Sequence, residues 1–170
     1  VQVVLVNQFG WSRQRIGQRL PKEMNIADLR RATDVEFGMA TYEPFGISPL
    51  EPLGSGALCV ISNVCGCEGF VEHVTGGDGT DNVIVADFTN VPGDPSIDEL
   101  KNMSADHRNQ VEGVEAARIA DVLMQRLPTD DAGRRALIEQ GQTLVQKMGW
   151  DQVCSDSLIP LLLKIAREPE

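Results

Sequence analysis

Two glutamates, Glu43 and Glu51, lie eight positions apart on either side of a glycine-containing segment, Phe45 to Ile47. An ionised carboxylate accepts hydrogen bonds from two donors at once, so adjacent sugar hydroxyls are suitable partners for such side chains. A glycine-containing corner that leads into a helix offers backbone amides and the positive end of the helix dipole to a phosphate. The spacing therefore permits a site that holds a sugar, a diphosphate and a ribose together.

The same segment also fits a purely structural interpretation. Ser48, Pro49 and Glu51 match a capping box, with Ser48 as the N-cap and the Glu51 side chain returning to the cap amide. Pro52 follows directly, and because a proline inside a helix costs about 3 kcal/mol, we expect that helix to start late or to be irregular. From the residues alone both interpretations stay open.

The elements that must position this corner alternate between strands and helices. Apolar, β-branched segments predict strands at residues 1–6, 35–41, 57–64 and 83–89. Helical spacing and caps predict helices at residues 25–34, 48–56, 111–127, 132–148 and 152–168. We expect residues 65–74 to form a loop that leads into a turn of helix, and residues 75–82 a turn. This alternation predicts an α/β fold with a Rossmann-like parallel sheet, helices on both faces, and ligands at the carboxyl ends of the strands.

The C-terminal half is predicted to be helical. Helical spacing places Val114 and Val122 on the same side of the helix at residues 111–127. Asp151 is a natural N-cap for the last helix, and Pro160 should kink or split that helix.

Composition and charge exclude several classes of function. The chain of 170 residues carries 15 Lys and Arg against 25 Asp and Glu, a formal net charge of −10. Such a surface repels phosphate backbones and anionic lipid, so nucleic acid and membranes are poor partners. We find no membrane span and no signal-peptide pattern, and we expect a cytoplasmic protein. The opening on a strand-like segment without Met leads us to expect a processed product or an excised piece of a longer protein.

The cysteines and histidines do not make a convincing metal site. The four cysteines are Cys59, Cys65, Cys67 and Cys154. Cys65 and Cys67 are too close in sequence for an easy disulfide, and the two histidines have no paired spacing. We interpret the thiols as buried side chains, with a redox function or a zinc site as the alternatives. We therefore expect no metal.

The segment from Glu43 to Glu51, E-P-F-G-I-x-x-x-E, resembles the E-x7-E motif of retaining, nucleotide-sugar-dependent glycosyltransferases with the GT-B fold. It is most similar to their glycogen/starch synthase, sucrose synthase and general glycosyltransferase branch. The resemblance continues, in the family's order, at residues 26–46, 54–71, 82–88 and 148–153. The family commonly has Gly-Gly where this chain has Cys65-Gly66.

The resemblance implies a role for each residue of the motif. Glu43 would lie beside the transferred hexose as a catalytic residue and bind its hydroxyls, and Glu51 would bind the ribose hydroxyls of the nucleotide. The amides that would meet the donor's sugar and diphosphate are those of Phe45, Gly46 and Ile47, with Gly66 passing nearby. The implied substrate is a UDP-, ADP- or GDP-hexose, with no cofactor and no metal.

The resemblance also implies missing parts. The family's basic Arg and Lys pair lies upstream of the matched region, and Arg13, Arg15 and Lys22 come too late in the order to replace it. We expect residues 1–127 to be the Rossmann-like nucleotide-sugar-binding segment and residues 128–170 the C-terminal helices of the same domain. The acceptor-binding N-terminal Rossmann domain of the parent would be absent, and the chain alone would be inactive.

Two further expectations concern partners and rivals. The apolar residues at 161–165 should need a partner, and self-association through the C-terminal helix would supply one. The rival interpretations are a non-catalytic module that binds a nucleotide or nucleotide sugar, and a structural α/β domain in which Glu51 is only a cap. The residues leave the base, the sugar and the acceptor open.

Overall fold

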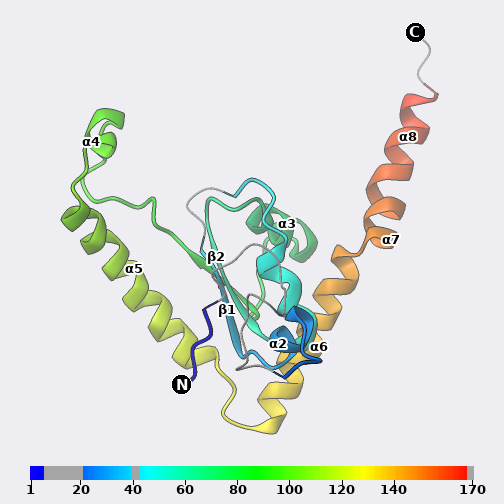
Figure 1. Ribbon diagram of the computed structural model, residues 1–170. Helices are drawn as coiled ribbons and strands as arrows, with labels where there is room; N and C mark the ends of the chain where they lie inside the picture. Colours follow the sequence, from blue (N-terminus) through cyan, green and yellow to red (C-terminus); the bar gives the residue numbers. More distant parts are fainter. Residues whose placement is uncertain (6–20, 40–42, 168–170) are drawn as a thin grey trace.

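A three-stranded parallel sheet lies at the centre of the computed structural model, which describes residues 1–5, 21–39 and 43–167 (Figure 1). The strands are β1 (Val35–Gly38), β2 (Leu58–Ser62) and β3 (Val83–Ala86), in the order β1-β2-β3. The register pairs Val35 with Leu58 and Cys59 with Val83. Three of the predicted strands are therefore confirmed, as is their parallel arrangement.

The first predicted strand is wrong over the residues that the structure describes. Residues 1–5 have no regular secondary structure, and Val1, Val3 and Leu5 are exposed. A β-branched sequence becomes a strand only where a neighbour supplies ladder hydrogen bonds and an apolar surface. None of β1, β2 and β3 pairs with residues 1–5. The remainder of that prediction falls on residues 6–20, outside the described part of the chain.

Helices cover both faces of the sheet, as the sequence predicts, because the side chains of β2 alternate between two apolar clusters. Cys59 and Ile61 face η1 (Ser48–Ser55), α3 (Gly66–Thr75) and Leu144 of α6 (Asp131–Met148). The opposite face carries Leu58, Val60, Ile84 and Ala86, packed against Ile119 of α5 (Ala105–Arg126) and Leu137 of α6. Every residue of β2 is buried, which explains its continuous apolar sequence.

Helix α2 (Ile26–Arg31) confirms the helix predicted before β1, and Asn25 and Asp28 form a capping box at its start. The loop expected at residues 65–74 is wrong, because α3 begins at Gly66 and continues to Thr75. Cys67 and Val71 lie four residues apart and are both buried in the core. This one-turn spacing of buried side chains lets the sheet stabilise a helix that begins without a side-chain cap.

Helix α5 is longer than predicted, and its partly buried residues Val122 and Leu123 pack against the sheet. It begins at Ala105, after the short α4 (Ile97–Lys101), and the Ser104 side chain accepts a hydrogen bond from the His107 amide. Its buried residues are Glu115 and Ile119, whereas Val114, predicted on the same side as Val122, is 75% exposed. The polar contacts of Glu115, described below, decide which side of α5 faces β3.

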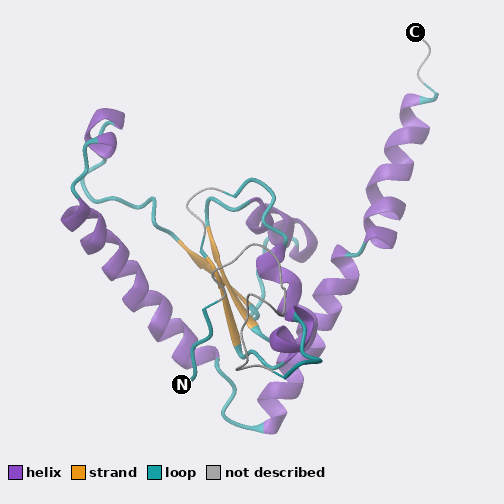
Figure 2. Ribbon diagram, viewed as in Figure 1, coloured by secondary structure: helices purple, strands orange, loops and turns teal. Residues whose placement is uncertain are grey.

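The chain ends in a row of helical segments that leaves the sheet (Figure 2). Helix α6 is followed by α7 (Trp150–Val153), a π-helical turn η2 (Cys154–Leu158) and α8 (Ile159–Ile165). Gly149, and not Asp151, takes the N-cap position of α7. Pro160 lies at the start of α8, directly after the π-helical turn, because a proline lacks the amide that would continue the ladder. The predicted split is wrong, since Leu158 and Ile159 keep right-handed helical backbone angles. Within the described ranges, no helix is long and apolar enough to cross a membrane.

Candidate functional site

The corner that follows β1 is tied to the start of the segment that follows β2. Glu43 forms an isolated parallel bridge with Cys65, and the Gly66 amide donates a hydrogen bond of 3.0 Å to the Glu43 carbonyl oxygen. Both segments follow the carboxyl ends of neighbouring parallel strands. The corner therefore lies at the edge of the sheet where such folds bind ligands.

Glu43 and Gly46 shape this corner together. The Gly46 amide donates a hydrogen bond of 3.2 Å to the Glu43 carboxylate oxygen Oε1. Gly46 has a φ of +47°, in the left-handed region, and a Cβ at this position would overlap the Cys65 sulfur. Only a glycine fits here without displacing its neighbours. The carboxylate expected at the transferred sugar thus organises the turn that carries the expected donor amides.

Gly66 allows α3 to begin directly against the corner. A Cβ at Gly66 would overlap the carbonyl oxygen of Pro44. The close approach places the N-terminus of α3, a helix of ten residues, next to the segment from Pro44 to Gly46. A helix N-terminus favours negative charge, so it complements the carboxylate of Glu43 or an anionic ligand. The expectation that Gly66 passes near the corner agrees with this geometry.

A hollow of about 590 Å³ opens beside the corner. Its lining residues are Glu36, Phe37, Gly38, Met39, Glu43, Phe45, Gly46, Ile47, Ser48 and Pro49. Phe45 and Ile47 are 81% and 66% exposed, so they form apolar walls that a ligand could cover. Four of the residues expected to contact the donor therefore border one hollow, whereas Glu51 and Gly66 do not border it.

Glu51 is held on the side of η1 by Arg30 of α2. The Arg30 Nη1 atom forms an ion pair with Glu51 Oε2. The same guanidinium donates two hydrogen bonds, of 3.0 and 2.8 Å, to the two carboxylate oxygens of Glu36 and one of 2.9 Å to the Ser48 hydroxyl. The Glu51 side chain is 55% exposed, so it keeps one side open to solvent.

The capping box expected at Ser48 and Glu51 is wrong. Ile47 takes the N-cap position of η1, no side chain caps it, and Ser48 is the first residue of the helix. Pro52 lies inside η1, which is a 3₁₀ helix that ends at Gly56, where φ is +82°. The predicted irregularity of this helix is confirmed, because the missing Pro52 amide and the ring both oppose a regular α-helix.

The role of Arg30 is not predictable from the spacing of residues in the sequence. Its partners lie six, eighteen and twenty-one positions further along the chain, on β1 and η1. No helical or strand periodicity links those positions. A weak signal was present, because the helix at residues 25–34 leads directly into the strand that carries Glu36.

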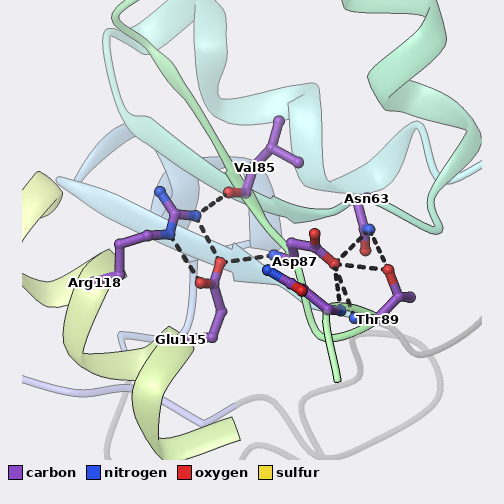
Figure 3. A network of polar contacts seen from close by, with 7 residues as sticks. Asn63, Val85, Asp87, Thr89, Glu115 and Arg118 are labelled. Carbon is purple, nitrogen blue, oxygen red and sulfur yellow. Dashed lines mark hydrogen bonds and ion pairs between the residues drawn. The ribbon is translucent and has the colours of Figure 1, made fainter. Parts of the chain in front are cut away.

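A second polar cluster lies at the carboxyl ends of β2 and β3 (Figure 3). The Asp87 oxygen Oδ1 accepts hydrogen bonds from the Asn63 side chain at 2.8 Å and from the Thr89 hydroxyl at 2.7 Å. The Asp87 amide donates at 2.7 Å to Glu115 of α5, and Arg118 binds both oxygens of Glu115 and the carbonyl oxygen of Val85. The cluster thus joins α5 to the open edge of β3.

The carboxylates of this cluster are stabilised in their ionised form. Hydrogen bonds from the Arg118 guanidinium hold the pKa of Glu115 below its usual value. Hydrogen bonds from the Thr89 hydroxyl and amide lower the pKa of Asp87. Both carboxylates already accept hydrogen bonds from protein donors. The cluster therefore connects α5 to the sheet and is not a catalytic pair.

Among the described residues, no three His, Cys, Asp or Glu side chains are placed to hold a metal ion together. Arg13 and Arg15, which come too late in the order to replace the family's basic pair, lie outside the described residues. No protein-family model matches the chain, and no curated protein matches it. The geometry of the corner is therefore what the functional proposal rests on.

Proposed function

We propose that this chain is the C-terminal part of the donor-binding domain of a retaining GT-B glycosyltransferase, which transfers a hexose from a nucleoside-diphosphate sugar. One observation carries the proposal: Glu43, Phe45, Gly46 and Ile47 border a single hollow at the carboxyl end of β1. These residues are the ones that the E-x7-E resemblance assigns to the hexose and the diphosphate. The parallel sheet with helices on both faces supports the same assignment.

In this proposal Glu43 accepts hydrogen bonds from the hexose hydroxyls through the part of its carboxylate that the Gly46 amide leaves free. The amides of Phe45 and Ile47 meet the sugar and the diphosphate, because the Gly46 amide already donates to the Glu43 carboxylate. The N-terminus of α3, held close by Gly66, adds a favourable field for the phosphates. Glu51 binds the ribose hydroxyls with its exposed side while Arg30 holds the other.

The parent protein supplies the rest of the machinery. Its N-terminal Rossmann domain binds the acceptor, and a basic pair upstream neutralises the leaving diphosphate, which is usually a large contribution to catalysis. The isolated chain therefore binds the donor without turning it over.

A donor titration tests the proposal. Isothermal calorimetry with UDP-glucose, ADP-glucose and GDP-mannose should give saturable binding of at least one donor. The Glu43→Gln variant should bind it about tenfold more weakly, the effect of losing one charged hydrogen bond. Glu139→Gln, on an exposed position of α6, is the matched control and should bind as the wild type does. A folded protein that binds none of the three donors would overturn the proposal.

The contact between Arg30 and Glu51 favours a second candidate, a module that binds a nucleotide or nucleotide sugar without chemistry. In that case Glu51 serves the fold, and the hollow serves only for recognition. Assays of the full-length parent separate the candidates. A transferase moves hexose from the bound donor to an acceptor or to water, whereas a binding module returns the donor intact.

A further inference from the structure

Cys65 and Cys67 face each other across Gly66. Their sulfur atoms lie 3.1 Å apart, both thiols are free, and the two residues are 3% and 1% exposed. They belong to the apolar cluster on the α3 side of the sheet. Two thiols that touch in this way form a dithiol and are not separate buried side chains.

The start of α3 brings the two thiols together. Side chains two positions apart within a helix do not face each other. Cys65, however, is the N-cap residue with extended backbone angles, φ −94° and ψ 130°, while Cys67 already lies in the first turn. The change of backbone between them turns both side chains to the same side. A disulfide has an S–S length of about 2.05 Å, so the sulfurs need to approach by only about 1 Å.

The dithiol lies directly behind the candidate donor site. The Cys65 sulfur is 3.8 Å from the Gly46 carbonyl oxygen, and Gly46 borders the hollow. Cys65 also forms the bridge with Glu43, whose carbonyl accepts the Gly66 amide. Any movement of Cys65 towards Cys67 therefore changes the support of the corner that carries Glu43.

We propose that Cys65 and Cys67 are a redox modification site, at which a peroxide converts the two thiols into an intramolecular disulfide that weakens ligand binding at the hollow. The effect on binding rests on the proposed function, whereas formation of the disulfide does not. A peroxide is the oxidant class because Cys65 and Cys67 are 3% and 1% exposed, so only a small molecule can reach their sulfur atoms.

The reaction proceeds in two balanced steps. The Cys65 sulfur, which is the one beside Gly46, attacks one peroxide oxygen and the O–O bond breaks. The leaving hydroxide takes the Cys65 thiol proton and departs as water, and Cys65 becomes a sulfenic acid. The Cys67 sulfur then attacks the Cys65 sulfur, the S–S bond forms, and the sulfenic oxygen leaves as a second water with the thiol proton. Two thiols are oxidised by two electrons, and one peroxide is reduced by two electrons.

The electrostatics of Cys67 support this division of roles. Burial, followed by the hydrogen bond with Cys65, raises the pKa of Cys67 to about 12. Cys67 therefore stays protonated in neutral solution and acts second, when the sulfenic acid is already in contact. Cys59, on β2, also has its pKa raised to about 12, mainly by burial.

Mass spectrometry tests the modification. The folded protein is treated with hydrogen peroxide, the remaining thiols are alkylated, and the digest is sequenced without reduction. We expect a loss of two hydrogen masses between Cys65 and Cys67 in the wild type and in Cys154→Ser. In Cys67→Ala, a cyclic diketone probe should label a sulfenic acid at Cys65. The proposal would be overturned if peroxide oxidised Cys59 or Cys154 while Cys65 and Cys67 stayed reduced. It would also be overturned if no disulfide formed between Cys65 and Cys67.

Donor binding tests the consequence. The oxidised wild type, checked by circular dichroism to be folded, should bind its donor about tenfold more weakly than the reduced protein, and dithiothreitol should restore affinity. Equal affinities in the two states would overturn the link between the disulfide and the hollow. A disulfide that forms in a protein that binds no donor would confirm the modification and contradict the proposed function instead.

Discussion

Arg30 holds Glu51, the second glutamate of the segment from Glu43 to Glu51, in an ion pair, and the same guanidinium makes a two-point contact with Glu36. One cation therefore joins α2, β1 and η1 beside the hollow. With two carboxylates on one guanidinium, removal of Arg30 would leave two negative charges close together without a counterion.

We expect Arg30→Ala to lower the free energy of unfolding by about 1–3 kcal/mol, because its side chain is only 18% exposed and serves two carboxylates. Arg31→Ala is the matched control. Arg31 makes a surface ion pair with Asp28 and is 68% exposed, so its loss should cost at most about 1 kcal/mol. Urea denaturation of both variants measures the difference, and similar losses would contradict the special role of Arg30.

Glu51→Gln separates the ribose role from the structural role. If Glu51 binds the ribose hydroxyls, the substitution should lower the affinity for the donor about tenfold in a calorimetric titration. Arg30→Ala is the control, because it breaks the same ion pair and keeps the carboxylate. If Glu51→Gln lowers the melting temperature and leaves the affinity for the donor unchanged, Glu51 serves only the fold.

Gly66→Ala should disturb the corner, because the added Cβ overlaps the Pro44 carbonyl oxygen. Overpacking of this kind typically costs about 1–3 kcal/mol. Gly69→Ala, one turn further along α3, meets no atom within 4 Å and should stabilise the helix by about 0.5–1 kcal/mol. Thermal unfolding of the two variants gives the comparison. Stabilisation by both alanines would show that α3 does not press against the corner.

The contact between Glu115 and Arg118 should make stability depend on pH. Because the pKa of Glu115 is lowered in the folded chain, the ionised carboxylate stabilises the fold above its ordinary pKa of about 4.3, and this stabilisation is lost as the pH falls below that value. The cost of Glu115→Gln should therefore be largest near neutral pH and shrink in acid. A double-mutant cycle with Arg118→Met, by urea denaturation across pH, isolates the pair. A cost that is the same at all pH values would contradict this account.

The last helical segments should associate in solution. Leu161, Leu162 and Ile165 of α8 are each more than half exposed, an apolar surface that water disfavours. Sedimentation velocity should detect a dimer or larger species that Leu162→Glu converts to monomer. Val114→Glu, at an equally apolar and more exposed position of α5, is the control and should leave association unchanged. A wild-type protein that remains monomeric over a wide concentration range would rule out self-association through α8.

Part of the structure could be predicted because its causes are local. The apolar sequences of β2 and β3 required burial on both faces, and Pro160 acted on its immediate neighbours. The errors arose where a distant contact decided the outcome. Residues 1–5 found no strand to pair with, and the helix at α3 depended on two buried side chains that meet the sheet.

The sequence by itself determined β1, β2 and β3, their parallel arrangement and the glycine-containing corner between Glu43 and Glu51, because periodicity and turn chemistry act over a few residues. Only the tertiary structure decided that Glu51 meets Arg30 while Glu43 meets the hollow, and that the Cys65 and Cys67 thiols touch. Those outcomes depend on how separate elements pack against one another. The direction of a side chain across such a contact is not encoded in the spacing of residues along the chain.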